Sequence, residues 1–218
     1  SRLLRDAWSM ERPILPAPDQ VIVEMNKTIF GKNISSKRSL VYHSWVTLSS
    51  TLLGFVIGGV LGILLAVGIV HVRALERSLL PWVITSQTIP ILAICFFPFT
   101  ISMVKGLRSP DPLAKDLMRT YSASNWDVFW KLRFPASVPF LFSAMKVGIA
   151  ISLVGAIVGE LPTGAQAGIG ARLLAGSYYG QTIQIWSALV TASILAGSLV
   201  ALVSVAERLT MRKMGVRT

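Results

Sequence analysis

Charged residues are scarce in this chain: Lys, Arg, Asp and Glu make up 14% of its 218 residues, whereas hydrophobic residues make up 53%. So small a polar share cannot cover the surface of a water-soluble globule, and we therefore predict an integral membrane protein. The single cysteine, Cys95, excludes an internal disulfide and cannot form a zinc site by itself. The two histidines, His43 and His71, are far apart and each adjoins the end of an apolar run, which favours interfacial positions over a metal site.

A phosphate-binding loop of the type G-x-x-x-x-G-K-S/T is missing from the sequence. We therefore do not expect this chain to hydrolyse ATP, and we predict no catalytic residues, cofactor or metal of its own. The net charge of +11 is also found in nucleic-acid-binding proteins. Here, however, the basic residues stand in blocks beside apolar runs rather than along a stripe interleaved with aromatic residues. This pattern is typical of cytoplasmic loops that fix membrane topology, and no nucleic-acid partner is expected.

The clearest membrane span is formed by residues 45–70, which contain no charge and are long enough to cross a hydrocarbon layer of about 30 Å. Gly54, Gly58 and Gly62 recur every fourth residue and share one helical face, so another backbone can approach closely. Two interpretations of this face remain open: static helix packing, or a surface that slides during gating.

Three further apolar segments follow at 79–104, 138–161 and 183–205, and prolines interrupt the first of them. The glycine-rich residues between the last two segments predict a loop, or a loop that dips back toward the membrane. Basic residues outnumber acidic ones after the first span, within 105–133 and at the C-terminal end. This excess places all three regions in the cytoplasm. Segment 79–104 joins two of these regions, yet two crossings need about 40 residues. A proline-hinged re-entrant hairpin or omitted residues would resolve the conflict.

One polar segment, DLMRTYSASNWDVFWKLRFP at residues 116–135, stands between apolar blocks and has helical amphipathicity. Trp126, Phe129 and Trp130 are spaced i, i+3 and i+4, and Ala123 lies three residues earlier, so one face is apolar. The spacing fits either a helix in the lipid headgroups or a helix docked into a groove on a partner.

This segment resembles the cytoplasmic loop of type I ABC importer permeases, which reads E-A-A, three residues, G and, further on, L-P. Asp116, Leu117 and Met118 occupy the E-A-A positions, Ser122 occupies the glycine position and Pro135 closes the motif. The neighbouring stretches GLRSPDP, ASNWDVFWKLRFPASVPFLFSAMKVG and GELPTGAQAGIGARL are similar to the nitrate, sulfonate and taurine branch of that family.

The resemblance implies an all-α, polytopic helical bundle in the bacterial inner membrane, with residues 1–44 preceding a permease domain at 45–218. It implies a homodimer, a partner ATPase that carries ATP and Mg, and an extracytoplasmic solute-binding protein. The expected cargo is a small solute, either a nitrate-, sulfonate- or taurine-like anion or a small heterocycle. The resemblance also favours the interpretation that residues are omitted from the sequence: two separate helices are joined near 94–95, and a first membrane helix is missing before residue 1.

The same resemblance assigns the loop 116–135 to coupling with the ATPase, through Asp116, Leu117, Met118, Ser122, Ala123, Trp126, Phe129 and Pro135. Trp126 and Phe129 are the expected anchors, because large aromatic side chains dominate the energy of small interfaces. For Asp116 two roles remain open: capping of the helix, or pairing with a cation of the partner.

Candidate residues for the substrate path are Lys146, Ser152, Gly155 and Gly159. An ion within a span is costly, so Lys146 faces either an anionic cargo or, by snorkelling, the interface. Small residues such as Gly155 equally serve helix packing. Glu160 lies at the outer end of its span, where it meets the binding protein, holds the outer loop or simply ends the span.

Two other functions fit the sequence. A secondary transporter without an ATPase partner would use Lys146 and the proline-broken segment as its site. A structural membrane scaffold would transport nothing.

Overall fold

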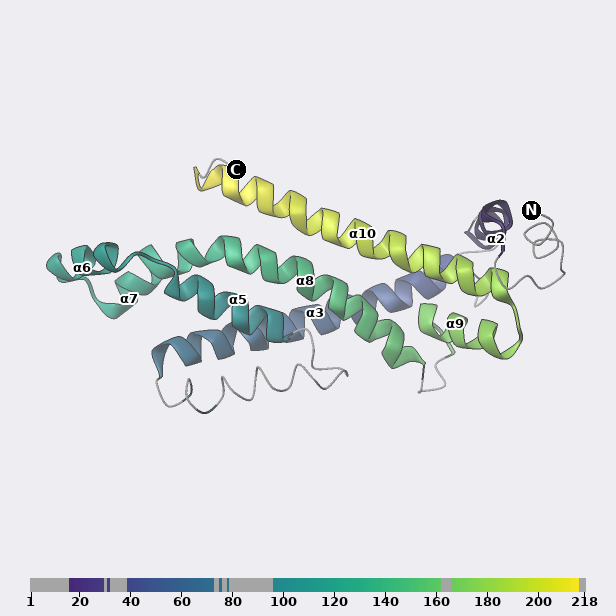
Figure 1. The fold of residues 1–218 in the computed structure, drawn as a ribbon, viewed down its shortest axis with the longest axis horizontal. Helices are drawn as coiled ribbons and strands as arrows, with labels where there is room; N and C mark the ends of the chain where they lie inside the picture. The colour runs from purple at the N-terminus through teal and green to yellow at the C-terminus, as the bar shows by residue number, and fades with distance from the viewer. Residues whose placement is uncertain are drawn as a thin grey trace, which may run out of the picture. The chain divides into compact units, whose positions relative to one another are not determined.

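The computed structural model describes residues 16–29, 31, 39–72, 75, 78, 96–161 and 166–215, and the regular secondary structure in these ranges is entirely helical. The prediction of an all-α fold is confirmed for this part of the chain. In chain order (Figure 1) the helices are α2 (Pro18–Ile29), α3 (Leu40–His71), α5 (Phe96–Arg108), α6 (Pro112–Thr120), α7 (Asn125–Val128), the π-helical turn η2 (Phe129–Arg133), α8 (Phe134–Glu160), α9 (Ile169–Tyr178) and α10 (Thr182–Lys213).

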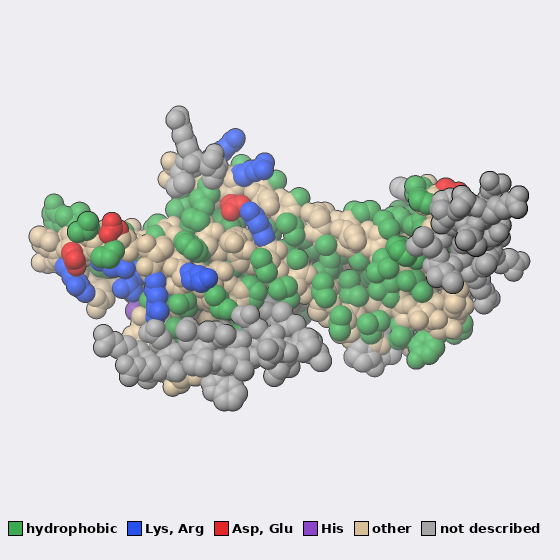
Figure 2. Space-filling view, viewed as in Figure 1, with side chains coloured by type: hydrophobic (Ala, Val, Ile, Leu, Met, Phe, Trp, Pro, Cys, Tyr) green, Lys and Arg blue, Asp and Glu red, His purple; other side chains and the backbone are tan. Residues whose placement is uncertain are grey.

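Three described helical stretches are long and apolar enough to cross a membrane: Leu40–His71, Asn125–Glu160 and Thr182–Lys213. They correspond to three of the four apolar segments of the sequence, which are thus confirmed as helices that are long and apolar enough to span a membrane. Hydrophobic side chains cover much of the visible helix surface (Figure 2), as expected where lipid replaces water. On α3, for example, the side chains of Leu53, Val56 and Leu64 are more than half exposed.

The remaining apolar segment is described only from Phe96 onward, where α5 begins. Pro98 lies in the first turn of α5, where its missing N–H would have had no helical acceptor. The predicted junction near residues 94–95, like the stretch before it, lies outside the described residues.

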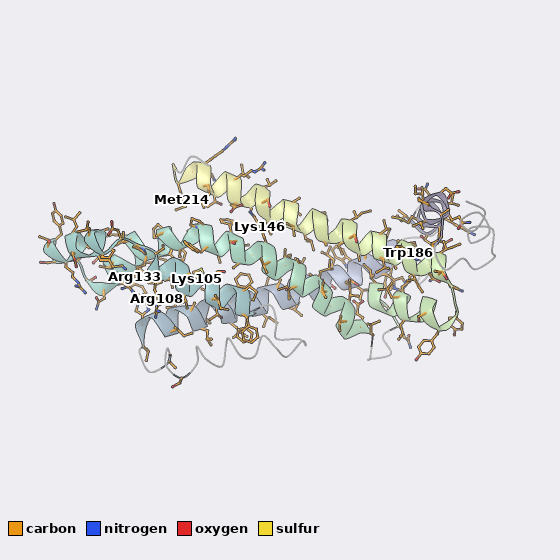
Figure 3. All side chains as sticks on the ribbon, in the orientation of Figure 1. Lys105, Arg108, Arg133, Lys146, Trp186 and Met214 are labelled. Carbon is orange, nitrogen blue, oxygen red and sulfur yellow. The ribbon has the colours of Figure 1, made fainter. Side chains whose placement is uncertain are left out.

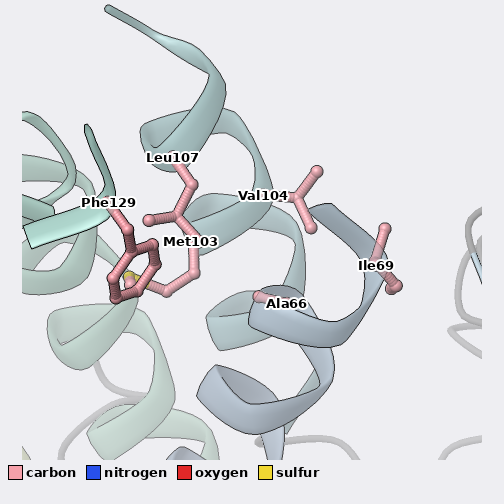
Figure 4. Packing of buried hydrophobic residues seen from close by; sticks show 6 residues of the cluster. All are labelled: Ala66, Ile69, Met103, Val104, Leu107 and Phe129. Carbon is pink, nitrogen blue, oxygen red and sulfur yellow. The ribbon is translucent and has the colours of Figure 1, made fainter. Parts of the chain in front are cut away.

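The chain divides into two compact units, and α3, α8 and α10 each supply residues to both. Unit 1 comprises Ser1–Leu52 and Leu153–Ser198, and unit 2 comprises Leu53–Ser152 and Leu199–Thr218. The main hydrophobic cluster belongs to unit 2 and joins α3, α5 and η2 (Figure 4). Its buried members are Ala66, Ile69, Met103, Val104, Leu107 and Phe129.

Close helix packing in unit 2 depends on small residues that face Phe99, a buried side chain of α5. A Cβ at Gly62 of α3 would lie 2.6 Å from the Phe96 carbonyl oxygen, and one at Gly148 of α8 would lie 2.6 Å from the Phe99 ring. A Cβ at Gly54, in contrast, would have no atom of the described residues within 4 Å. Among the described residues, the glycine face of α3 is thus used for close packing at Gly62, whereas a Cβ at Gly54 would have space.

The prediction that the glycine-rich stretch after α8 is only a loop is wrong, because α9 forms within it. Its sequence carries Gly170 and Gly176, which disfavour an isolated helix. In unit 1 these glycines instead permit contact: a Cβ at Gly170 would collide with the Ile157 carbonyl oxygen, and one at Gly176 would lie 2.7 Å from Ile185. Tertiary packing therefore outweighs the low local propensity.

Candidate functional site

The segment predicted as one amphipathic element, 116–135, is divided into two short helices. Helix α6 starts after Asp111, whose carboxylate accepts a hydrogen bond from the Leu113 N–H at 3.0 Å. It ends at a turn in which Ser122 has a φ of 53°, and the Ala123 N–H donates to the Met118 carbonyl oxygen at 3.0 Å. This left-handed conformation favours glycine, the residue that the related motif has at this position.

Helix α7 then starts with its own cap, in which the Ser124 hydroxyl accepts a hydrogen bond from the Asp127 N–H at 3.1 Å. From Asn125 the helix continues without interruption through η2 into the span that ends at Glu160. The expected 116–135 helix is therefore corrected to a helix, a tight turn and the start of a span.

An exposed stripe runs along α6 to its C-cap. It is formed by Leu113, Leu117 and the C-cap residue Tyr121, and we call it the α6 stripe. These side chains are 75%, 58% and 79% exposed, and no residue of α6 is buried. The spacing of four residues places them on one helical face. Leu113 and Tyr121 are additions to the predicted set, although their spacing with Leu117 was available in the sequence.

Asp116 does not cap α6, because Asp111 performs that function. The Asp116 carboxylate lies 3.5 Å from the Arg119 guanidinium, and both side chains are well exposed. An exposed pair of this kind contributes little to stability, so Asp116 can exchange this partner for another cation at small cost.

The two predicted aromatic anchors differ sharply in environment. The Trp126 side chain is 70% exposed, whereas Phe129 is 7% exposed and belongs to the core cluster of unit 2. The Phe129 ring lies 5.4 Å from the His71 ring at the end of α3 and 6.1 Å from the Trp126 ring. The expectation that Phe129 anchors a partner is therefore corrected: its ring packs inside its own chain. Pro135 is half-buried in the first turn of α8.

Lys146 of α8 forms an ion pair with Glu207 of α10, with 2.5 Å between Nζ and Oε2. Both side chains are only partly exposed. The charge of Lys146 is thus neutralised within unit 2. The sequence did not reveal Glu207 as its partner, because Glu207 lies far along the chain.

The other three candidates for the substrate path follow Lys146 on α8. Ser152 is buried, and its hydroxyl has no hydrogen-bond partner within the described part of the chain. A Cβ added at Gly155 or Gly159 would meet no described residue within 4 Å, so neither glycine is needed for packing within the described part of the chain.

Glu160 is buried in unit 1 and takes part in a set of contacts that hold the start of α9. Its carboxylate accepts hydrogen bonds from the Thr47 hydroxyl at 2.8 Å and from the Gly170 N–H at 2.7 Å. The Thr47 oxygen also accepts from the Ile169 N–H at 2.8 Å, and His43 Nδ1 accepts from the Gly168 N–H at 2.9 Å.

Three successive backbone donors are therefore satisfied by side chains from α3 and α8. Gly168 has a φ of 116°, and a Cβ there would collide with the Glu160 carboxylate, so this position requires glycine. Of the roles predicted for Glu160, holding the segment that follows its span matches these contacts.

Within the described residues, no three or more His, Cys, Asp or Glu side chains are grouped so that they could hold a metal ion.

Comparison with known proteins places these features in a family. Residues 93–216, more than half of the chain, match the model of the binding-protein-dependent transport system inner membrane component family. The formylaminopyrimidine transport permease protein ThiX of Halalkalibacterium halodurans is 27% identical, and the match covers 72% of this chain and 68% of that protein. The riboflavin transport system permease protein RibX of Chloroflexus aurantiacus is 28% identical, with coverage of 91% and 80%. The nitrate import permease protein NrtB of a Synechocystis species is 23% identical, with coverage of 69% and 64%.

The family match, the helical architecture and the three candidate spans agree with one another. The chain therefore belongs to the binding-protein-dependent transport system inner membrane components, the multi-pass permeases of ABC transporters with the type I permease fold.

Proposed function

We propose that this chain is the membrane-spanning subunit of an ATP-driven importer and that it couples to a partner ATPase through residues 116–135. The observation that carries the proposal is the α6 stripe: two leucines on a helix that buries none of its own residues, followed by an exposed tyrosine at the C-cap. The stripe lies within the basic region assigned to the cytoplasm, the side on which ATP is available. The ATPase, not this chain, would hold ATP and Mg.

The contacts of unit 2 give this loop a mechanical connection to the spans. Trp126 is exposed at the start of α7, and its ring stacks on Phe129. Phe129 in turn packs against Met103 and Leu107 of α5 and against α3. Because packed interiors transmit displacement rather than absorb it, a force applied to α7 reaches two neighbouring helices through Phe129.

The remaining partners and the cargo follow from the family. An extracytoplasmic binding protein would deliver the solute to the side opposite the basic loops, and a second copy of the chain would complete the path. Ser152, Gly155 and Gly159 are proposed to border that path, because one has a buried hydroxyl to offer and the others leave space. Lys146 would present an ion pair with Glu207, rather than an isolated cation, to a passing solute. A nitrate-, sulfonate- or taurine-like anion and a small heterocycle both remain candidates.

The test compares two substitutions in the same helix. Leu117→Gln removes the centre of the α6 stripe, whereas Arg119→Gln removes an exposed charge on the opposite side of α6. Loss of a buried leucine at an interface costs roughly 2 kcal/mol, so Leu117→Gln should lower co-purification of the ATPase by more than tenfold. Arg119→Gln should change it little, and equal effects of the two would contradict the assignment.

A second measurement addresses coupling itself. Trp126→Ala in a reconstituted transporter should leave ATP hydrolysis running while solute uptake falls, because the exposed ring no longer transfers force to Phe129. Uptake driven by an ion gradient alone, with no ATPase present, would instead favour a secondary transporter.

A further inference from the structure

Two helix ends and the turn η2 lie at one level of unit 2. Helix α3 ends at His71 and α5 ends at Arg108, while η2 leads into α8. The Phe129 ring ties them together, since it faces His71 and packs with Met103 and Leu107. Apolar spans lie on one side of this level and the polar loop of α6 and α7 lies on the other, so the level marks the edge of the hydrocarbon layer.

Three cations gather at this edge. Lys105 and Arg108 occupy the last turn of α5, and Arg133 ends η2, which contacts α5. Figure 3 shows the three residues near one another, and Figure 2 shows Lys and Arg side chains in a row at this end of the molecule. We call these three residues the basic site.

The carboxylates of the adjoining loop are already engaged. Asp111 caps α6, Asp116 pairs with Arg119, and Asp127 lies 2.7 Å from Lys131. Lys105 and Arg133 form no ion pair with the part of the chain that the structure describes. The Arg133 Nε is buried there without a hydrogen-bond acceptor. A buried donor of this kind is costly unless an acceptor is supplied, which favours an anion that does not belong to the described residues.

The position of the basic site at the edge of the hydrocarbon layer indicates which anion would bind there. Lipid phosphates lie at the edge of the hydrocarbon layer, where tryptophan is also favoured, and Trp130 is exposed beside the site. We propose that Lys105, Arg108 and Arg133 bind the phosphate of an anionic phospholipid in the cytoplasmic leaflet. This site is distinct from the α6 stripe, which is apolar and reserved for a protein.

The experiment measures lipid retention on the purified full-length permease by native mass spectrometry, with phosphatidylglycerol and phosphatidylcholine as probes. Each surface cation contributes roughly a fivefold preference for an anionic lipid, so K105Q/R108Q/R133Q should lower phosphatidylglycerol retention by at least roughly tenfold. Retention of phosphatidylcholine should not change. The matched control K27Q/R212Q/K213Q removes the same charge from exposed positions on α2 and α10 and should retain phosphatidylglycerol.

Each alternative outcome overturns the proposal. Unchanged phosphatidylglycerol retention in the triple variant excludes the site, and an equal loss in the control reduces the effect to net charge. Loss of ATPase co-purification with lipid retention intact assigns the cations to a protein partner instead. If the triple variant does not fold, the exposed Lys105 still allows Lys105→Gln alone, which should lower retention by roughly fivefold.

Discussion

Replacing Thr47 with valine should release the start of α9 while keeping the shape of the side chain. Thr47 is fully buried, and its oxygen serves two partners: it donates to the Glu160 carboxylate and accepts from the Ile169 N–H. An orphaned buried N–H costs about 1–3 kcal/mol, and a hydrogen bond lost by a carboxylate costs about as much. We therefore expect the free energy needed to open this contact to fall by about 3 kcal/mol. The equilibrium constant for opening would then rise by a factor of roughly 100.

Thr51 supplies the matched control, one turn further along α3. It is also fully buried, but its hydroxyl donates only to the Thr47 carbonyl oxygen at 2.7 Å, within the same helix. Thr51→Val should therefore cost less than about 1 kcal/mol. Hydrogen exchange of the backbone amides at 168–170 measures the difference directly. Exchange should accelerate strongly in Thr47→Val and little in Thr51→Val, and similar rates in both variants would refute the role given to Thr47.

Three other substitutions test the packing and the charges of unit 2. Gly62→Ala should destabilise the protein by about 1–3 kcal/mol because its methyl group meets α5, whereas Gly54→Ala should be tolerated or stabilising; thermal unfolding in detergent compares the two. Ser122→Gly should raise the unfolding temperature, because it relieves a left-handed conformation that costs about 1 kcal/mol; a lower unfolding temperature would contradict the described turn. Lys146→Gln should lower stability by stranding the Glu207 carboxylate, and the charge swap K146E/E207K should restore part of it. No recovery in the swap would show that the ion pair is not the source of the loss.

The spans were predictable because their signal is local. A charge-free run such as 45–70 has one stable arrangement in a bilayer, a helix, whatever its neighbours are. The predicted ends were less accurate: α10 continues eight residues past the apolar segment 183–205, to Lys213, because helical hydrogen bonding does not stop where hydrophobicity does.

The site was only partly predictable, because its features depend on contacts between distant residues. Trp126 and Phe129 belong to the same apolar pattern, yet one is exposed and the other is in the core. Only the positions of α3 and α5 decide which of the two is covered. The partner of Lys146 and the helical state of α9 depend in the same way on residues far along the chain.

The manner in which α9 is held sets how its sequence can vary. His43, Thr47 and Glu160 accept hydrogen bonds from backbone N–H groups, which every residue except proline possesses, so this attachment does not depend on the side chains of α9. Outside the glycines at the contact, the side chains of α9 can therefore differ from one relative to another while the helix stays attached at the same place. Substitutions on the exposed surface of α9 would therefore leave these backbone hydrogen bonds intact.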